Sequence, residues 1–431
     1  MNKLLMSMMA VVLMLAACSK NNGADVSELL KTIPADASLV MVMDLEGILK
    51  DADCSVDNGQ IKPGKKFAEA LKQANDPELR SKLETLNDSG IEWSSAAIFV
   101  EGYNTYLTGF LSDSGKFRQV VEERFGEKFE SGEVNTCGNV AVDGERFWVC
   151  LNSHNTIVAN DIRHFKSLSE KQSILSNENV AKLSTITTDI AGWGDIKGTL
   201  NLAGLNFATR AAVTMGLETV FVDAVEVEWT ASFDKDEMVA EIAVLNTKGG
   251  IAKFNFPVET IDENVVKNLN MKAEGFGALA ISEKMIETVR EQTSQEGFSL
   301  LGALVNMMGS VQGTTAVAFD DDNTAGVIST TGHGTADLSD ALSQWGFTVS
   351  KEGKDLKLSR GAVSGAMTSA EAAEMLKGAV CGVAVSPLEE TDNKCRALSF
   401  CLKPEKGGLK GELRLKGADA KQPFLLGLIS K

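Results

Sequence analysis

Two long stretches of alternating apolar and polar residues, one in each half of the chain, constrain the fold most strongly. From Val225–Phe233 every second residue is apolar, and Met238–Val244 continues the pattern after a short turn. A period of two is typical of a β-hairpin with one buried face and one solvent-facing face. Leu398–Pro404 and Leu409–Leu415 predict a second hairpin of the same kind.

The two hairpins close two similar series of elements. An ungapped alignment of their second strands matches Met238, Glu241, Ile242 and Val244 with Leu409, Glu412, Leu413 and Leu415. A strand running into a helix is expected at Ser38–Lys50, where Asp44 would cap the helix, and again at Asp189–Asn201, Gly275–Val289 and, in shortened form, Val380–Leu388.

This shared order predicts an internally duplicated α+β chain, in which each half is an antiparallel sheet with helices packed on one face. Two unrelated α+β domains with similar hairpins are the alternative. The expected halves are 25–255 and 270–431, because the segment between them contains Pro257 and a polar run. Further helices are predicted at Lys65–Ala74, Glu78–Leu86, Phe117–Phe125, Glu283–Gln292, Ser299–Met308 and Ala370–Lys377.

The first eighteen residues predict a lipoprotein signal peptide. Lys3 gives a positive start, and Leu4–Ala17 is apolar apart from Ser7, which is too short a run to span a bilayer. The closing Leu-Ala-Ala-Cys resembles the bacterial lipobox. That resemblance implies removal of residues 1–17 and attachment of a diacylglyceryl group, whose acyl chains can be palmitoyl, to the sulfur of Cys18, which would anchor the protein to a membrane. An ordinary signal peptide with a chance cysteine is the alternative.

Residues 18–24 then form a short lipidated tether. Ser19, rather than Asp, follows the lipid cysteine, and no acidic run follows it. By analogy with known sorting rules, this favours a lipid-anchored protein of the cell envelope on the periplasmic side of an outer membrane, with exposure at the cell surface as the alternative.

The overall charge excludes one class of partner. The chain has 42 Lys and Arg against 59 Asp and Glu, a net charge of −17. Nucleic-acid binding needs basic patches, so no nucleic-acid partner is expected. The acidic residues are spread along the chain, which is typical of a soluble surface.

Hairpin geometry predicts a disulfide between Cys137 and Cys150. Asp143-Gly144 is a strong signal for a two-residue turn, and counting outward from it places the two cysteines opposite each other on a non-hydrogen-bonded pair. Two free buried thiols are the alternative. Cys54 is expected to be a lone buried thiol, and the pairing of Cys381, Cys395 and Cys401 stays open.

No catalytic or cofactor motif is present. His154, His164 and His333 have no metal-ligand spacing, and neither a phosphate loop nor a nucleophile elbow occurs. The cluster 320–323, three Asp and one Asn, is better explained by a turn than by Ca²⁺ binding. We therefore predict no catalytic residues, no metal and no cofactor.

Three segments together carry a family resemblance: Ile33–Val40, Asp44–Leu49 and Ser89–Ser95. They resemble a group of Bacteroidetes lipoproteins that share a domain of unknown function. The resemblance supports the fold and the location over most of the mature chain, and it implies no site.

These observations predict a non-enzymatic envelope lipoprotein that binds an envelope protein or ligand, or acts as a scaffold. One alternative is a periplasmic hydrolase with a carboxylate-based site, for which Asp44, Asp195 or Glu241 could serve. The other is a carrier of hydrophobic ligands that uses the apolar stretch Leu300–Met308.

Overall fold

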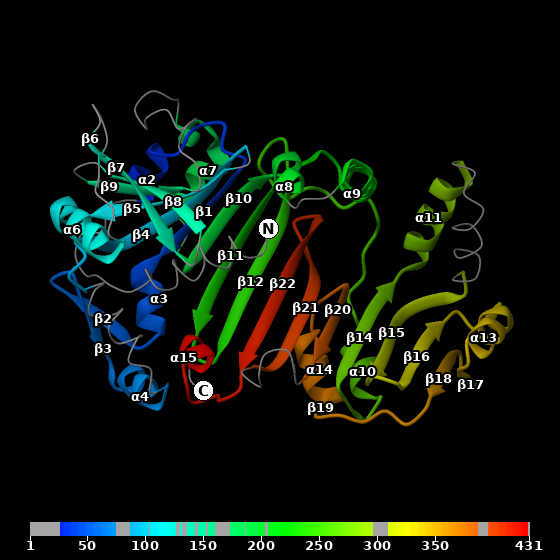
Figure 1. Ribbon diagram of the computed structural model, residues 1–431. Helices are drawn as coiled ribbons and strands as arrows, with labels where there is room; N and C mark the ends of the chain where they lie inside the picture. The colour runs from blue at the N-terminus through cyan, green and yellow to red at the C-terminus, as the bar shows by residue number, and fades with distance from the viewer. Residues whose placement is uncertain are drawn as a thin grey trace.

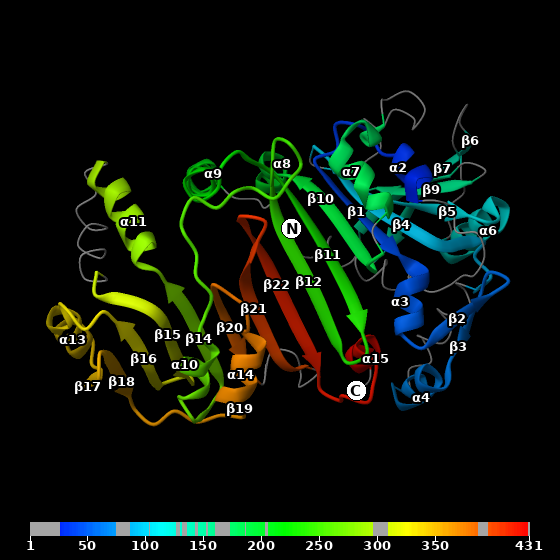
Figure 2. The same ribbon diagram turned by 180° about the vertical axis from the view of Figure 1, so that it is seen from behind.

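The computed structural model describes residues 26–74, 87–102, 104–125, 130–131, 136–142, 145–151, 154–159, 173–185, 187–202, 206–295, 309–386 and 395–429. Within these residues the dominant feature is one twisted sheet of 18 strands, with helices along its edges and over parts of both faces (Figures 1 and 2). The predicted α+β class with a large antiparallel sheet is confirmed.

The amino-terminal half supplies ten strands to this sheet. They are β1 (Leu39–Asp44), β4 (Ile91–Glu101), β5 (Asn104–Leu111), β6 (Glu130–Ser131), β7 (Thr136–Val142), β8 (Glu145–Leu151), β9 (Asn155–Ala159), β10 (Ile190–Asp195), β11 (Ala224–Asp234) and β12 (Glu237–Asn246). Their order in space is β6-β7-β8-β9-β5-β4-β1-β10-β11-β12, and every neighbouring pair is antiparallel.

The carboxy-terminal half supplies the other eight strands. They are β14 (Gly275–Ile281), β15 (Val311–Phe319), β16 (Thr324–Thr330), β17 (Thr348–Glu352), β18 (Asp355–Arg360), β20 (Cys381–Val385), β21 (Cys395–Glu405) and β22 (Gly408–Gly417). Their order is β22-β21-β20-β14-β15-β16-β18-β17, again antiparallel throughout. Two small two-stranded sheets lie apart from it: the hairpin of β2 (Cys54–Asp57) and β3 (Gln60–Pro63), and the antiparallel pair of β13 (Lys272–Ala273) and β19 (Met367–Thr368).

The two halves join edge to edge between β12 and β22, which we call the seam. Seven residues of β12, Glu237–Ala243, pair with Lys410–Lys416 of β22. At the middle of the seam Glu241 lies opposite Glu412. The seam makes one continuous sheet from strands that are far apart in the sequence.

The helices are short. They are α2 (Val26–Lys31), α3 (Leu45–Asp51), α4 (Lys65–Ala74), α6 (Ser114–Phe125), α7 (Glu178–Lys182), α8 (Ile196–Leu202), α9 (Phe207–Val220), α10 (Glu263–Lys267), α11 (Glu283–Gln295), α13 (Thr335–Gln344), α14 (Ser369–Met375) and α15 (Phe424–Ile429). None of the helices in the described ranges is both long and apolar enough to cross a membrane.

Most elements predicted from the sequence are confirmed. The two hairpins form as β11–β12 and β21–β22, and helices occur where expected at α4, α6, α11 and α14. Asp44 ends β1 and caps α3, where its Oδ1 accepts from the backbone N–H of Gly47 at 3.0 Å. The signal peptide, the tether and the predicted helices Glu78–Leu86 and Ser299–Met308 lie outside the described residues.

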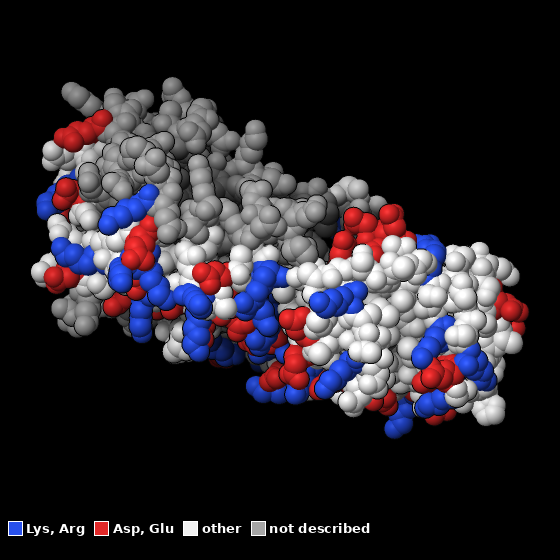
Figure 3. Space-filling view, turned by 90° about the horizontal axis from the view of Figure 1, so that it is seen from below, with Lys and Arg blue, Asp and Glu red and all other residues white. Residues whose placement is uncertain are grey.

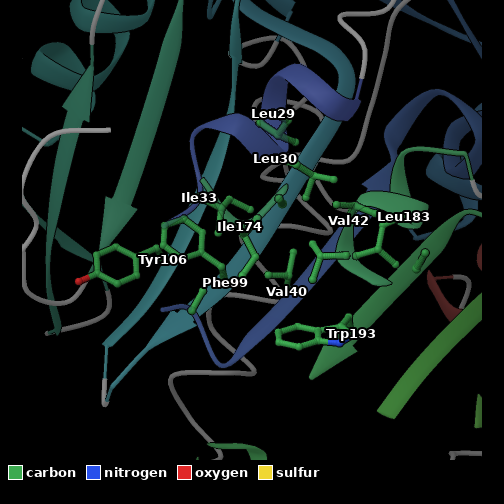
Figure 4. Packing of buried hydrophobic residues seen from close by; sticks show 14 of the residues in the cluster. Leu29, Leu30, Ile33, Val40, Val42, Phe99, Tyr106, Ile174, Leu183 and Trp193 are labelled. Atoms are coloured by element: carbon green, nitrogen blue, oxygen red, sulfur yellow. The ribbon is translucent and has the colours of Figure 1, made fainter. Parts of the chain in front are cut away.

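The helices are not confined to one face of the sheet, contrary to the prediction. Val40 and Val42 of β1 pack with Phe99 into a core beneath α2 (Figure 4). Met43, on the other face of the same strand, packs with Ile98 into a core that includes α3 and α4. The reason is that the residues of β1 before Asp44 are all apolar, so that both faces of this strand need cover.

Candidate apolar binding face

The central strands carry an uncharged apolar surface, which we call the apolar face. Residues directly opposite each other in neighbouring strands lie on the same side of a sheet. The pairing Trp229–Ile242–Gly411–Leu402 therefore crosses four strands on one side, from β11 to β21. Applied to the neighbouring positions, the same register gives the members of the face: Val227, Trp229, Ala240, Ile242, Leu413, Leu398, Phe400, Leu402 and Val383.

In β12, β20 and β21 the apolar face is less covered than the opposite side of the same strands. Ile242 is 44% exposed and Phe400 is 39% exposed, and the other members are half-buried. On the opposite side Ala243, Cys401 and Ala384 are buried. The alternation in β11 and β12 predicts a buried apolar side, and this expectation is wrong for the centre of the sheet. Although α10 and α14 cover the opposite side of β14 and β20, no described helix covers the centre of the apolar face.

Glycines let large side chains lie flat along this face. A Cβ atom at Gly192 would lie 2.2 Å from Cε2 of Trp229, so the indole ring occupies the space above that glycine. A Cβ atom at Gly411 would lie 2.7 Å from Cγ2 of Ile242 and 3.5 Å from Cε2 of Phe400. These close approaches make the apolar surface continuous from β10 to β21.

Helices close the two ends of the face (Figure 1). At one end α8 lies over β10, where a Cβ atom at Gly194 would meet Oγ1 of Thr199 at 2.6 Å. At the other end α15 stacks Phe424 on Phe233 of β11, with 6.2 Å between the ring centroids. The open part of the face is therefore the stretch between α8 and α15.

The opposite side of the seam carries a network of ion pairs. Glu412 is buried and accepts from Nζ of Lys403 and Nε of Arg414, each at 2.7 Å. Burial by itself raises the pKa of Glu412, but the hydrogen bonds from Arg414 and Lys403 outweigh it and hold the pKa below its usual value. Glu241, a candidate acid of the hydrolase alternative, pairs with Lys410 at 3.0 Å. The carboxylates of Glu412 and Glu241 are therefore both engaged in ion pairs.

Charges of both signs are interspersed elsewhere as well. Seen from below, Lys and Arg side chains alternate with Asp and Glu over the lower surface of the molecule (Figure 3). This mixed distribution agrees with the solubility interpretation of the acidic composition.

A second polar cluster lies where β10 and β11 meet the end of α3. Oδ2 of Asp189 accepts from the backbone N–H of Phe233 at 2.7 Å, and its carboxyl group is hydrogen-bonded to that of Asp51. Burial, the Asp189 charge and this hydrogen bond, and then the charge of Asp234, raise the pKa of Asp51 to about 7. Burial also raises the pKa of Asp189, and Asp44 adds to this effect.

Sequence reasoning missed Asp51 and Asp189, because nothing local shows that the end of α3 meets the start of β10. Of the acids that it named, Asp44 caps α3 and Asp195 accepts from the backbone N–H of Gly198 at 2.6 Å. Across the described residues, no three His, Cys, Asp or Glu side chains are grouped so that they could hold a metal ion.

The acidic stretch at 320–323 forms a turn. Oδ1 of Asp320 accepts from the backbone N–H groups of Asp322 and Asn323, and its Oδ2 accepts from that of Ser364. These bonds, that from Ser364 first, hold the pKa of Asp320 below its usual value. The carboxylate is therefore engaged by backbone groups, as the turn interpretation requires.

The positions of the described cysteines agree in part with the expectations from the sequence. The β7–β8 register places Cys137 opposite Cys150, as the hairpin geometry predicts, and the bond between them stays a prediction. Cys54 is a buried free thiol whose pKa burial raises to about 12. No disulfide joins Cys381, Cys395 or Cys401 to another described residue. Cys18 lies outside the described residues.

Comparisons with known proteins give little support for any assignment. No family model matches the chain, and no curated protein matches it. Among solved structures, crystal form I of TP0453 aligns with 83% of this chain and 96% of its own, at 9% identity and a TM-score of 0.29. Crystal form III of TP0453 aligns with 80% and 96%, at 10% identity and the same TM-score. TM-scores this low do not establish a common fold.

Proposed function

We propose that this chain is a non-enzymatic lipoprotein of the cell envelope, and that it binds the acyl chains of lipids on the apolar face. The observation that carries the proposal is the exposure of Ile242 and Phe400 at the centre of an uncharged sheet surface. Exposed contiguous apolar surface on a soluble protein marks an interaction site.

The chemistry of the face favours hydrocarbon over a protein surface. Protein interfaces carry about one hydrogen bond per 100–200 Å². The members of the apolar face have aliphatic and aromatic side chains, and among them only the indole of Trp229 has a polar group. An acyl chain requires no hydrogen bonds, and it gains about 0.8 kcal/mol for each CH₂ group removed from water.

The predicted location agrees with this function. The lipobox-like sequence before Cys18 supports a lipid anchor. Ser19 in place of Asp, together with the lack of an acidic run after Cys18, supports the periplasmic side of an outer membrane. A protein tethered there has membrane lipid as its most abundant apolar neighbour.

We also infer that the two halves are copies of one ancestral unit. Outward from the seam, the strand order is β12-β11-β10-β1-β4-β5-β9 on one side and β22-β21-β20-β14-β15-β16-β18 on the other. The ungapped alignment equates Glu241 with Glu412, and these two residues face each other across the seam. Equivalent residues of two antiparallel copies meet in this way only at a two-fold axis.

Titration with the fluorescent fatty acid cis-parinaric acid tests the proposed function. The protein is the full mature chain with Cys18→Ala, which removes its own lipid. We expect Ile242→Glu and Phe400→Glu each to weaken binding at least tenfold, because a carboxylate would be placed within the apolar face. Trp345→Glu is the matched control, because Trp345 is 59% exposed and lies beyond α13, away from this face.

Equal binding by Ile242→Glu and the Trp345→Glu control would overturn the proposal. Absence of fatty-acid binding, together with capture in cells of one protein whose crosslink Ile242→Glu abolishes, would also overturn it and would assign the face to a protein partner. Circular dichroism spectra checked for each variant separate loss of binding from loss of folding.

A further inference from the structure

Helix α9 presents apolar side chains to solvent along most of its length. Phe207 is 79% exposed and Met215 is 66% exposed, and none of its 14 residues is buried. A surface helix normally turns its apolar side inward and its polar side outward. Here the outward side contains Phe207, Ala208, Ala212 and Met215, which we call the outer stripe of α9.

The outer stripe carries almost no charge. Within α9 the charged residues are Arg210, which lies on the half-buried side, and Glu218, which is exposed one turn after Met215 near the end of the helix. The amino-terminal end of the helix is capped, because Oδ1 of Asn206 accepts from the backbone N–H of Thr209 at 2.9 Å. The apolar exposure is thus a property of a well-formed helix of almost four turns.

The position of α9 relates it to the membrane anchor. In both Figure 1 and Figure 2, α2, α8 and α9 lie along the same upper edge of the molecule, far from α4, α10 and α15. Helix α2 begins at Val26, only eight residues after Cys18. Eight extended residues span at most about 28 Å, so a lipid on Cys18 holds α2 within that distance of the bilayer.

We propose that α9 docks on the phospholipid bilayer and places Phe207 and Met215 among the upper acyl chains. This inference rests on the lipid anchor within the proposed function, and it does not require acyl chains to bind on the apolar face. Docking in this orientation turns the α8 end of the apolar face toward the membrane, since α8 and α9 are consecutive helices on that edge. Phe and Met supply apolar area at the depth where interfacial helices insert.

Co-sedimentation with vesicles of phosphatidylethanolamine containing a minor fraction of phosphatidylglycerol tests the inference. The protein is the mature chain with Cys18→Ala, so that only the protein surface contributes. The combined substitution Phe207→Ser and Met215→Ser should lower the vesicle partition coefficient at least tenfold. The matched control Trp345→Ser removes an apolar side chain that is 59% exposed from another part of the molecule and should leave partitioning unchanged.

Added salt should not weaken partitioning, because the acidic chain is repelled by anionic lipid and salt screens that repulsion. Equal partitioning of the double variant and the Trp345→Ser control would overturn the inference, as would a failure of the parent protein to bind vesicles. The result is separable from the proposed function. The double variant should keep its affinity for cis-parinaric acid, and Ile242→Glu should keep its affinity for vesicles.

Discussion

Replacing Asp51 with asparagine should stabilise the protein at neutral and alkaline pH. Asp51 is half-buried, hydrogen-bonded to the Asp189 carboxyl group and close to Asp234, and Lys50 only partly offsets these acidic neighbours. Its pKa is raised from 3.8 to about 7, mainly by burial. The asparagine keeps a donor for Asp189 and carries no charge.

The direction in which stability changes with pH follows from the number of protons bound in each state. Between about pH 4 and pH 7 the folded state holds a proton on Asp51 that the unfolded chain has released, so the free energy of unfolding falls as pH rises. Above pH 7 Asp51 is ionised in both states, and its charge destabilises the folded state to the full extent. The difference between the two pKa values corresponds to about 4 kcal/mol, and solvent screening of a half-buried group reduces this to about 1–2 kcal/mol.

Urea unfolding followed by tryptophan fluorescence measures the effect. Asp51→Asn should be about 1–2 kcal/mol more stable than the parent protein at about pH 8 and equal to it at about pH 4. Asp57→Asn, at an exposed position in the β2–β3 hairpin, is the matched control and should change little at either pH. A stability difference that is the same at both pH values would refute the reasoning, and so would a loss of stability at about pH 8.

Three further changes have defined outcomes. Glu412→Gln should lower the free energy of unfolding by about 2 kcal/mol at neutral pH, since it removes the buried carboxylate that accepts from Lys403 and Arg414. The loss should shrink in acid, because the pKa of Glu412 is held low in the folded state, and urea unfolding at two pH values checks this. Cys137→Ala should cost about 3 kcal/mol relative to the oxidised protein and nothing relative to the reduced one, as thermal unfolding with and without reductant would show. Cys18→Ala should abolish incorporation of labelled palmitate into the protein in cells, and equal labelling of the variant and the parent protein would remove the lipid-anchor prediction.

Local sequence patterns predicted the hairpins well, because a period of two fixes both the strands and their pairing. The same patterns did not predict exposure. In β11 the alternation predicts that the side containing Trp229 is buried, yet in the structure these side chains are only half-buried. Alternation shows which side chains share a face, whereas cover depends on whether another element packs there.

The contact between Asp51 and Asp189 could not be predicted from the sequence for a similar reason. Asp51 ends α3, and Asp189 directly precedes β10 far along the chain. Their contact exists because β10 pairs with β1, which places the start of β10 beside α3. Only the order of strands in the sheet brings these two side chains together. By contrast, Asp44 was predictable as a cap, because capping acts within one turn of helix.

The seam between β12 and β22 has a consequence for biogenesis. Strand β22 leaves the ribosome long after β12, and no other strand among the described residues pairs with β12 on that edge. Until β22 has been made, the amino-terminal half therefore presents an unpaired strand edge, a state that invites pairing with other chains. We expect folding to finish at the middle of the sheet, and a chain that stops before Gly408 to aggregate or be degraded rather than accumulate as a stable half.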